Sequence, residues 1–167
     1  MRTAKHLTED ASTLIEASVA AAICALFLGS LFTLNTKAMS TLKSAREAAC
    51  ASQVLQQRIE ALRIANWHQV TDADWLTANI LNADASGASG LKSASETLTL
   101  EPYGSANTAT TQISRSSGQA NIVTRNSNLL SEFAVKVTWV VNYTGTPNDR
   151  PMTRQTVAIL GKGGVAR

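Results

Sequence analysis

The sequence predicts an α+β fold in which one long N-terminal helix packs on a small antiparallel sheet. A run of twenty residues, Ala17–Thr36, carries no charge and has the length that a helix needs to cross a bilayer. The segment that follows repeats apolar residues at helical spacing, and the first proline of the chain is Pro102. Residues 133–143 then place an apolar side chain at every second position, which is typical of a half-buried strand.

Composition bounds the size and the class of the protein. The 167 residues are enough for one modest domain and an additional segment. Apolar residues make up 44% of the chain but aromatic residues only 5%, so the expected core is small and built on aliphatic side chains. The net charge of +3 is spread along the chain, which does not indicate a nucleic-acid partner.

A single helix is expected from about Thr13 to about Asn66, roughly 80 Å long at about 1.5 Å per residue. Its first half is apolar all round, whereas its second half is amphipathic and needs a covering surface. The apolar stripe of that second half consists of Ala48, Ala51, Leu55, Ile59 and Leu62. The predicted organisation is therefore a polar leader (residues 1–11), a membrane half of the helix (12–36) and an amphipathic helix with a small β domain (37–167).

The remainder of the chain is expected to supply loops and a sheet. Residues 133–143 form the clearest strand, with Phe133, Val135, Val137, Trp139, Val141 and Tyr143 on one face that would cover the helical stripe. Residues 144–149 are turn material, and residues 154–160 return as the second strand of a hairpin. Residues 97–100 predict a short strand ended by Pro102, residues 121–125 a further strand, and residues 86–95 and 104–118 flexible surface loops.

No constellation of residues indicates catalysis, so we expect the protein not to be an enzyme and to hold no cofactor or metal. Its two histidines, His6 and His68, lie far apart in the sequence and outside any catalytic motif. Cys24 and Cys50 would lie roughly 39 Å apart on one helix, too far for a disulfide within one subunit. Residues 66–84 form a transition that contains Asp72 and Asp74. This acidic pair suggests calcium, but Ca²⁺ needs six to eight oxygens, which favours ordinary solvated carboxylates.

The most informative residues stand where the apolar run begins. Glu16 is a carboxylate at the start of an otherwise uncharged membrane-length segment, and such a group needs a partner or a reason. Two ordinary interpretations compete: Thr13 caps the helix and Glu16 closes a capping box, or Glu16 lies in water at headgroup depth. A secretory signal peptide would have a shorter apolar core followed by a cleavage site, whereas here more helix follows the run.

The residues from Thr13 to Glu16 (Thr-Leu-Ile-Glu), followed by Ala-Ser-Val-Ala, closely resemble the prepilin signature of type IV pilins and secretion pseudopilins. The amphipathic continuation and the Val-Lys-Val-Thr-Trp strand look like the minor-pilin and minor-pseudopilin subgroup. In the family a prepilin peptidase removes a short charged leader and methylates the new amine. The resemblance thus implies recognition of Thr13, Leu14, Ile15 and Glu16, cleavage between Ala11 and Ser12, and N-methylation of Ser12.

The same resemblance implies a role in assembly for Glu16, which would pair with the Ser12 amine of an adjacent subunit in a filament. Two positions depart from the family pattern, because Ala11 stands where the family has Gly and Ser12 where it has Phe. The implied partners are the prepilin peptidase, other pilin or pseudopilin subunits, the inner-membrane assembly platform and the lipid bilayer.

The expected function is that of a structural, minor subunit of a type IV pilus or a type II secretion pseudopilus. The implied location is the inner membrane, single-pass, with the globular domain in the periplasm, or outside the cell once assembled. Lysine and arginine residues stand on both sides of the apolar run, so the positive-inside rule does not settle this orientation. The alternative is a monomeric, signal-anchored periplasmic binding or adaptor protein that uses the same helix as a plain tether.

Overall fold

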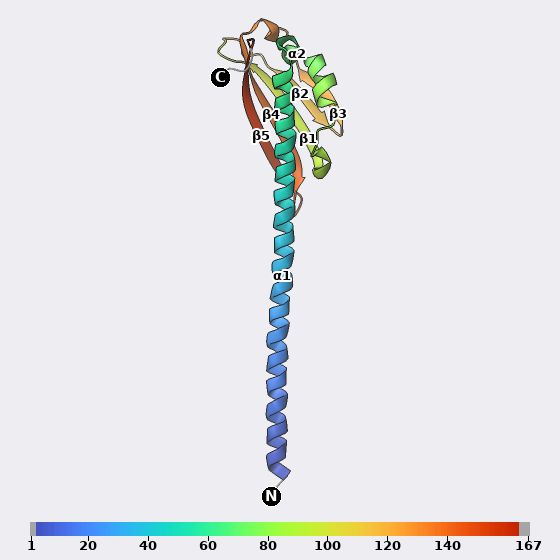
Figure 1. Ribbon diagram of the computed structural model, residues 1–167, viewed down its shortest axis with the longest axis vertical. Helices are drawn as coiled ribbons and strands as arrows, with labels where there is room; N and C mark the ends of the chain where they lie inside the picture. The colour runs from blue at the N-terminus through green and yellow to red at the C-terminus, as the bar shows by residue number, and fades with distance from the viewer. Residues whose placement is uncertain (1–2, 164–167) are drawn as a thin grey trace. The chain divides into compact units, whose positions relative to one another are not determined.

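The computed structural model describes the backbone of residues 3–163 and the side chains of residues 14–163. The chain divides into two compact units, Met1–Leu42 and Lys43–Arg167. Helix α1 (Thr3–Ile64, 62 residues) belongs to both of them (Figure 1). The predicted long helix is therefore confirmed, and it ends within two residues of the expected position.

The start of α1 differs from the prediction. The helix begins at Thr3 and not near Thr13, because residues 3–12 contain neither proline nor glycine and are rich in helix-forming residues. With the residues before it present, Thr13 is thus an interior helical residue and does not occupy the N-cap position of a capping box. Removal of residues 1–11 would bring it close to the helix start.

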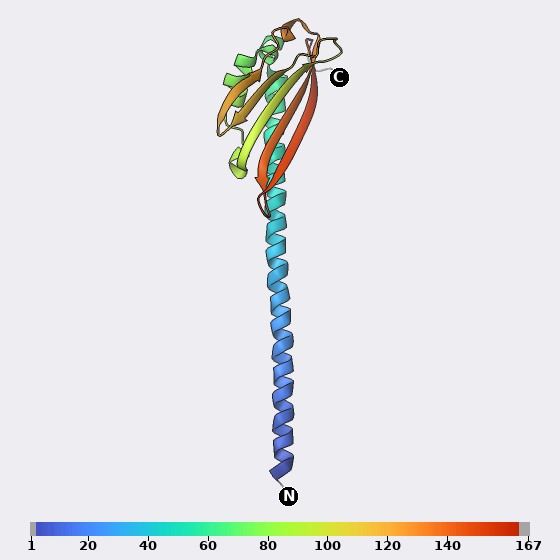
Figure 2. The ribbon, with the colours of Figure 1, turned by 180° about the vertical axis from the view of Figure 1, so that it is seen from behind.

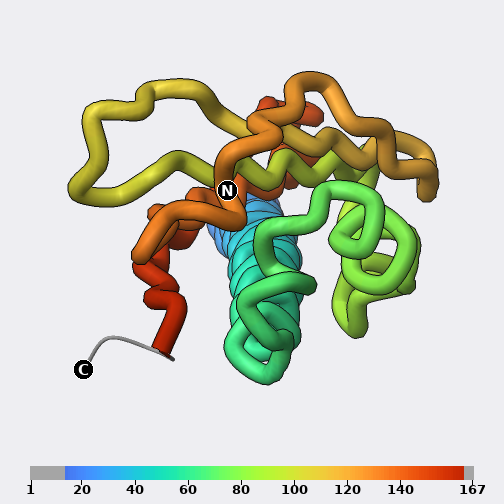
Figure 3. The backbone as a smooth tube through the Cα atoms, turned by 90° about the horizontal axis from the view of Figure 1, so that it is seen from above, coloured from blue at the N-terminus to red at the C-terminus, as the bar shows by residue number. Residues whose placement is uncertain are grey.

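Short helices replace the predicted transition between α1 and the sheet. They are α2 (Trp67–Thr71), α3 (Ala73–Leu76) and the π-helical turn η1 (Thr77–Leu81). Asn66 begins α2 with a capping box, because its side chain accepts from the Gln69 amide while the Gln69 side chain accepts from the Asn66 amide, each at 3.0 Å. Seen along α1, this segment lies on the same side of the sheet as the second half of α1 (Figure 3).

The sheet has five antiparallel strands in the order β3-β2-β1-β4-β5 (Figure 2). Their bounds are β1 Lys92–Pro102, β2 Thr111–Ser116, β3 Gln119–Thr124, β4 Ala134–Gly145 and β5 Arg150–Gly161. Two single 3₁₀ turns, η2 (Ala88–Gly90) and η3 (Leu129–Ser131), precede β1 and β4. The α+β architecture and the final hairpin are as the sequence predicts.

Three loop and strand boundaries were wrong. The stretch 104–118 is not one surface loop, because it contains β2, whose alternate residues Thr111, Ile113 and Arg115 are buried. Strand β1 takes in the last part of the expected 86–95 loop and runs as far as Pro102, which sits at the strand end, where a missing amide does least harm. Strand β5 likewise starts at Arg150, four residues earlier than expected.

The inward face of β4 is confirmed with one exception. Val135, Val137, Trp139 and Val141 are fully buried and Tyr143 is 4% exposed. Phe133, in contrast, is 85% exposed. It lies outside β4, two residues after the end of η3 and directly before the first residue of the strand, so the alternation of the strand does not extend to it.

The apolar stripe of α1 covers this core as expected. Ala51, Leu55, Ile59 and Leu62 are at most 8% exposed, while Ala48 is only half-buried. Two further stripe residues, Val54 and Arg58, are 1% and 3% exposed. The second half of α1 therefore buries a charged side chain together with its apolar ones.

Candidate functional site

The predicted recognition segment lies within the first unit, on α1. The backbone of Ala11, Ser12 and Thr13 is helical, and their side chains lie outside the described residues. Leu14 and Ile15 are 69% and 64% exposed, and Glu16 is exposed as well. No other part of the described chain therefore covers the side chains of Leu14, Ile15 and Glu16.

After this motif, large apolar side chains project from α1 in all directions. They are all exposed in the single chain: Val19, Ile23, Leu26, Phe27, Leu28, Leu31, Phe32 and Leu34. In the described part of the chain, α1 is the one helix that is long and apolar enough to cross a membrane. So much exposed apolar surface is costly in water, and it indicates a lipid or protein environment for this half of the helix.

Hydroxyl groups within the apolar run are satisfied by the helix itself. Ser18 Oγ donates to the Leu14 carbonyl at 2.8 Å, and Ser30 Oγ donates to the Phe27 carbonyl at 2.7 Å. Thr33 and Thr36 donate in the same way to carbonyls one turn earlier, each at 2.9 Å. Because these hydroxyls need no partner outside the helix, they are compatible with a surrounding of hydrocarbon.

The second unit contains a buried ion cluster that sequence reasoning missed. Arg58 Nε and Nη2 donate to the two carboxylate oxygens of Glu96, each at 2.9 Å. Arg115 Nη1 donates to Glu96 Oε1 at 3.0 Å and Nη2 to Asp84 Oδ1 at 3.0 Å. The side chains of Arg58 and Glu96 are 3% and 4% exposed, so this cluster joins α1 to β1 and β2 in the interior.

Backbone and aromatic groups complete this cluster. Arg58 also donates to the carbonyls of Ile80 and Ala83, the latter at 3.0 Å. Trp139 Nε1 donates to Glu96 Oε2 at 3.2 Å, and the Arg58 guanidinium lies 5.8 Å from the Trp139 ring centroid. Because its charges are buried and paired, removal of any one partner would leave an uncompensated charge inside the domain.

The alternation of inward and outward residues along β1 and β2 indicates which charged residues are buried in this cluster. Glu96 has the same parity as Leu98 and Leu100, and Arg115 has the same parity as Ile113, so both charges stand at inward positions of their strands. The strand register places Glu96 directly opposite Arg115. A charge that shares the buried face of a strand needs an opposite charge nearby, which the sequence pattern could have suggested.

Two further carboxylates are fixed by their neighbours. Glu47 of α1 accepts from the Thr146 amide at 2.8 Å and from the Thr146 hydroxyl at 2.7 Å, and these two hydrogen bonds lower the pKa of the Glu47 carboxyl. The Asp74 pKa is also lowered, because Arg125 donates to both Asp74 oxygens. Asp72 accepts from the Asp74 amide at 3.0 Å and begins α3. Both aspartates are exposed, but each has a defined structural partner.

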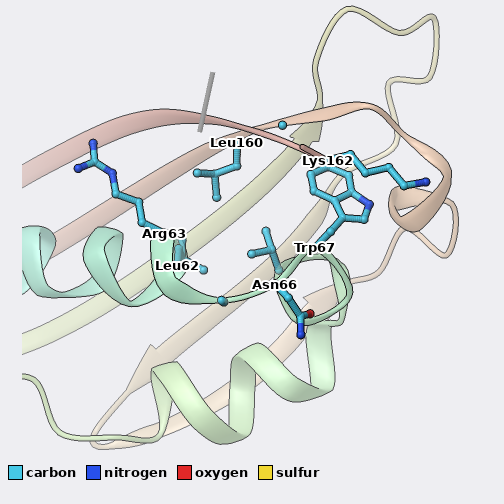
Figure 4. Close-up of a pocket in the computed structure, with 9 residues that line it drawn as sticks. Leu62, Arg63, Asn66, Trp67, Leu160 and Lys162 are labelled. Carbon is cyan, nitrogen blue, oxygen red and sulfur yellow. The ribbon is translucent and has the colours of Figure 1, made fainter. Parts of the chain in front are cut away.

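A hollow of about 240 Å³ lies where α1 ends (Figure 4). Its lining includes the apolar side chains of Leu62, Trp67 and Leu160, and its charged residues are Arg63 and Lys162. Arg63 is already bound to Glu60 at 2.8 Å. Within this lining there is no carboxylate, histidine or cysteine, so the hollow does not present an acid–base pair or a nucleophile.

Metal-ligating groups are scattered in the part of the chain that the structure describes, where no three His, Cys, Asp or Glu side chains gather. Cys24 is exposed and Cys50 is half-buried, and each is a free thiol. His68 is exposed on α2.

No protein family, curated protein or solved structure matches this chain.

Proposed function

We propose that this chain is a type IV pilin-like prepilin, a structural subunit of the minor type in a type IV pilus or a type II secretion pseudopilus. The observation that carries the proposal is the composition of α1. One helix contains the Thr13–Glu16 motif, continues through a fully exposed apolar run and ends in a stripe that a sheet covers. An anchor alone would need the apolar run, but it would not need Glu16.

Processing would create the assembly site. Cleavage between Ala11 and Ser12 makes Ser12 the first residue, and its methylated amine is a positive charge at a helix start, where the helix dipole disfavours a cation. The Glu16 carboxylate of a neighbouring subunit would neutralise that amine within an apolar bundle, where such pairing is much stronger than in water. Repetition of this contact sets the axial stagger between subunits and generates a helical filament.

Intact-mass analysis of the protein extracted from membranes tests the processing step. We expect a chain that starts at Ser12 and carries one added methyl group, in cells with an active prepilin peptidase. A chain that still starts at Met1 in those cells would remove the basis for the proposal. It would favour the plain tether, which retains its first residues.

Replacement of Glu16 tests the assembly step. Glu16→Ala removes a polar group from a helix that is already long enough to span, so the protein should still reach the inner membrane. It should be strongly depleted from sheared pili or crosslinked pseudopilus complexes, and Glu16→Gln should be depleted as well. Glu60→Ala is the matched control, since Glu60 lies on the exposed face of the same helix. Normal incorporation of both Glu16 variants would favour the tether.

A further inference from the structure

Among the described residues of the second unit, six of the eleven lysines and arginines have a carboxylate partner. Ion pairs are formed by Arg58, Arg63, Lys92, Arg115, Arg125 and Lys136. Among the described residues of this unit, the cations that form no ion pair are Lys43, Arg46, Arg150, Arg154 and Lys162. These unpaired charges determine where the surface of the unit is free to attract an anionic partner.

Three of these five cations gather at one end of the unit. Lys43 and Arg46 precede Glu47 on α1, and Glu47 accepts both hydrogen bonds from Thr146 in the β4–β5 turn. Arg150 follows the same turn, opposite Gly145 in the strand register. All three side chains are exposed.

Lys92 belongs to the same end, because it starts β1 opposite Thr144 of β4. Lys43 and Lys92 line one shallow hollow of about 310 Å³ together with Glu47 and Asp149. We call Lys43, Arg46, Lys92 and Arg150 the basic end.

Two carboxylates lie at the basic end, and neither offsets its charge fully. Glu47 is 8% exposed, and its two oxygens are occupied by Thr146. Asp149 pairs with Lys92 at 2.9 Å across an exposed surface, where such pairs are weak. Four cations against these two acids leave a net charge of +2, and the Glu47 charge is turned inward.

We propose that the basic end docks on the anionic headgroups of the bilayer that holds the apolar run of α1. This inference rests on the membrane span of the proposed function but on neither cleavage nor assembly. Lys43 follows Thr36, the last residue of the uncharged run, by seven residues, which reach about 25 Å at most when fully extended. Residues 36–43 are helical in α1, where they rise about 10 Å, so Lys43 lies within the range of the membrane charge.

Electrostatics favour lipid over a second copy of the chain. Each Lys or Arg near an anionic membrane surface strengthens the attraction by about fivefold, within a range of about 10 Å at moderate salt. The same end of another copy is equally basic and would repel it. The docking would hold the second unit at the membrane surface.

The test uses the full chain in nanodiscs of phosphatidylcholine alone or of equal parts phosphatidylcholine and phosphatidylglycerol. An uncharged amine-acetylating reagent labels lysines, and mass spectrometry gives the rate at each position. We expect Lys43 and Lys92 to react about threefold more slowly with phosphatidylglycerol present, and this difference to vanish at high salt. Lys162 should react equally in both, because it follows β5 at the strand end opposite Arg150.

Two variants separate docking from a general surface potential, which also slows amine labelling. Arg46→Gln/Arg150→Gln retains both reporter lysines and should abolish the slowing at Lys92, whereas Arg154→Gln should preserve it. Equal rates in the two lipids, or slowing that persists in the double variant, would overturn the inference. A chain that fails to insert into either nanodisc would overturn the membrane span itself, and with it both proposals.

Discussion

Replacing the buried carboxylate of Glu96 should destabilise the globular unit more than any other single loss of charge. In Glu96→Gln, the buried Arg58 guanidinium loses its ion-pair partner, and Arg115 retains only its pair with the exposed Asp84. The amide also replaces one accepting oxygen by an NH2 group, which then faces an Arg58 donor together with a donor of Arg115 or Trp139. The shape of the side chain is almost unchanged, so the loss reports on charge and not on packing.

The magnitude follows from burial. Removing one partner of a buried ion pair costs about 3–5 kcal/mol, and the 3% and 4% exposure of Arg58 and Glu96 places this pair in that class. A unit of about 125 residues unfolds with an entropy of about 0.26 kcal/mol per degree. We therefore expect the melting temperature of Glu96→Gln to fall by about 10–20 °C.

Tryptophan fluorescence of the full chain in detergent micelles measures this shift, because Trp67, Trp75 and Trp139 all lie in the globular unit. Glu101→Gln is the matched control, since Glu101 lies on the same strand but its pair with Lys136 is 39–41% exposed. Exposed pairs contribute about 0–1 kcal/mol, so the control should melt within a few degrees of the wild type. Similar melting temperatures for the two variants would refute the burial of the cluster.

Three other changes probe separate contacts. Thr146 lowers the pKa of Glu47 below its ordinary value of 4.5, so the folded state binds fewer protons than the unfolded chain. Stability should fall as the pH drops below this ordinary value, and Glu47→Gln should show a weaker fall in its urea midpoint. Trp139→Ser should cost about 3–5 kcal/mol in urea unfolding, whereas an unchanged midpoint would mean that Trp139 faces solvent. Gly90→Ala places a Cβ 2.8 Å from Cys50 Sγ, so it should lower the melting temperature, and Cys50→Ala in the same chain should restore it.

Local periodicity explains what could be predicted about the fold. The Ala51–Leu62 stripe and the alternation of residues 135–143 each encode a buried face within one element, and both were found. Strand β2 was missed because its inward residues include Thr111 and Arg115, which look like loop residues until a partner is known. Its burial depends on Glu96, 19 positions away in the chain, and no short window contains both.

The Thr13–Glu16 segment and the ion cluster around Glu96 differ in how far local sequence can suggest them, for the same reason. The Thr13–Glu16 segment belongs to a helix that has no described tertiary partner there, so its placement follows from the sequence alone. The ion cluster joins residues 19 to 43 positions apart and exists only after the sheet has formed. A sequence motif could therefore suggest the Thr13–Glu16 segment, which stays a prediction, whereas the ion cluster could be found only in the folded unit.

The two halves of α1 should be separable, because they depend on different surroundings. A chain shortened to begin at Thr36 loses the exposed apolar run but retains every buried residue of the stripe, so we expect it to be soluble and folded. A chain that begins at Gln57 is the control, since it lacks Ala51, Val54 and Leu55, which are at most 6% exposed. Burying a valine and a leucine contributes about 3–6 kcal/mol, comparable with a typical net stability of about 5–15 kcal/mol. The control should therefore show no cooperative melting by circular dichroism. An unfolded Thr36 chain, or a folded Gln57 chain, would mean that the stripe does not build the core.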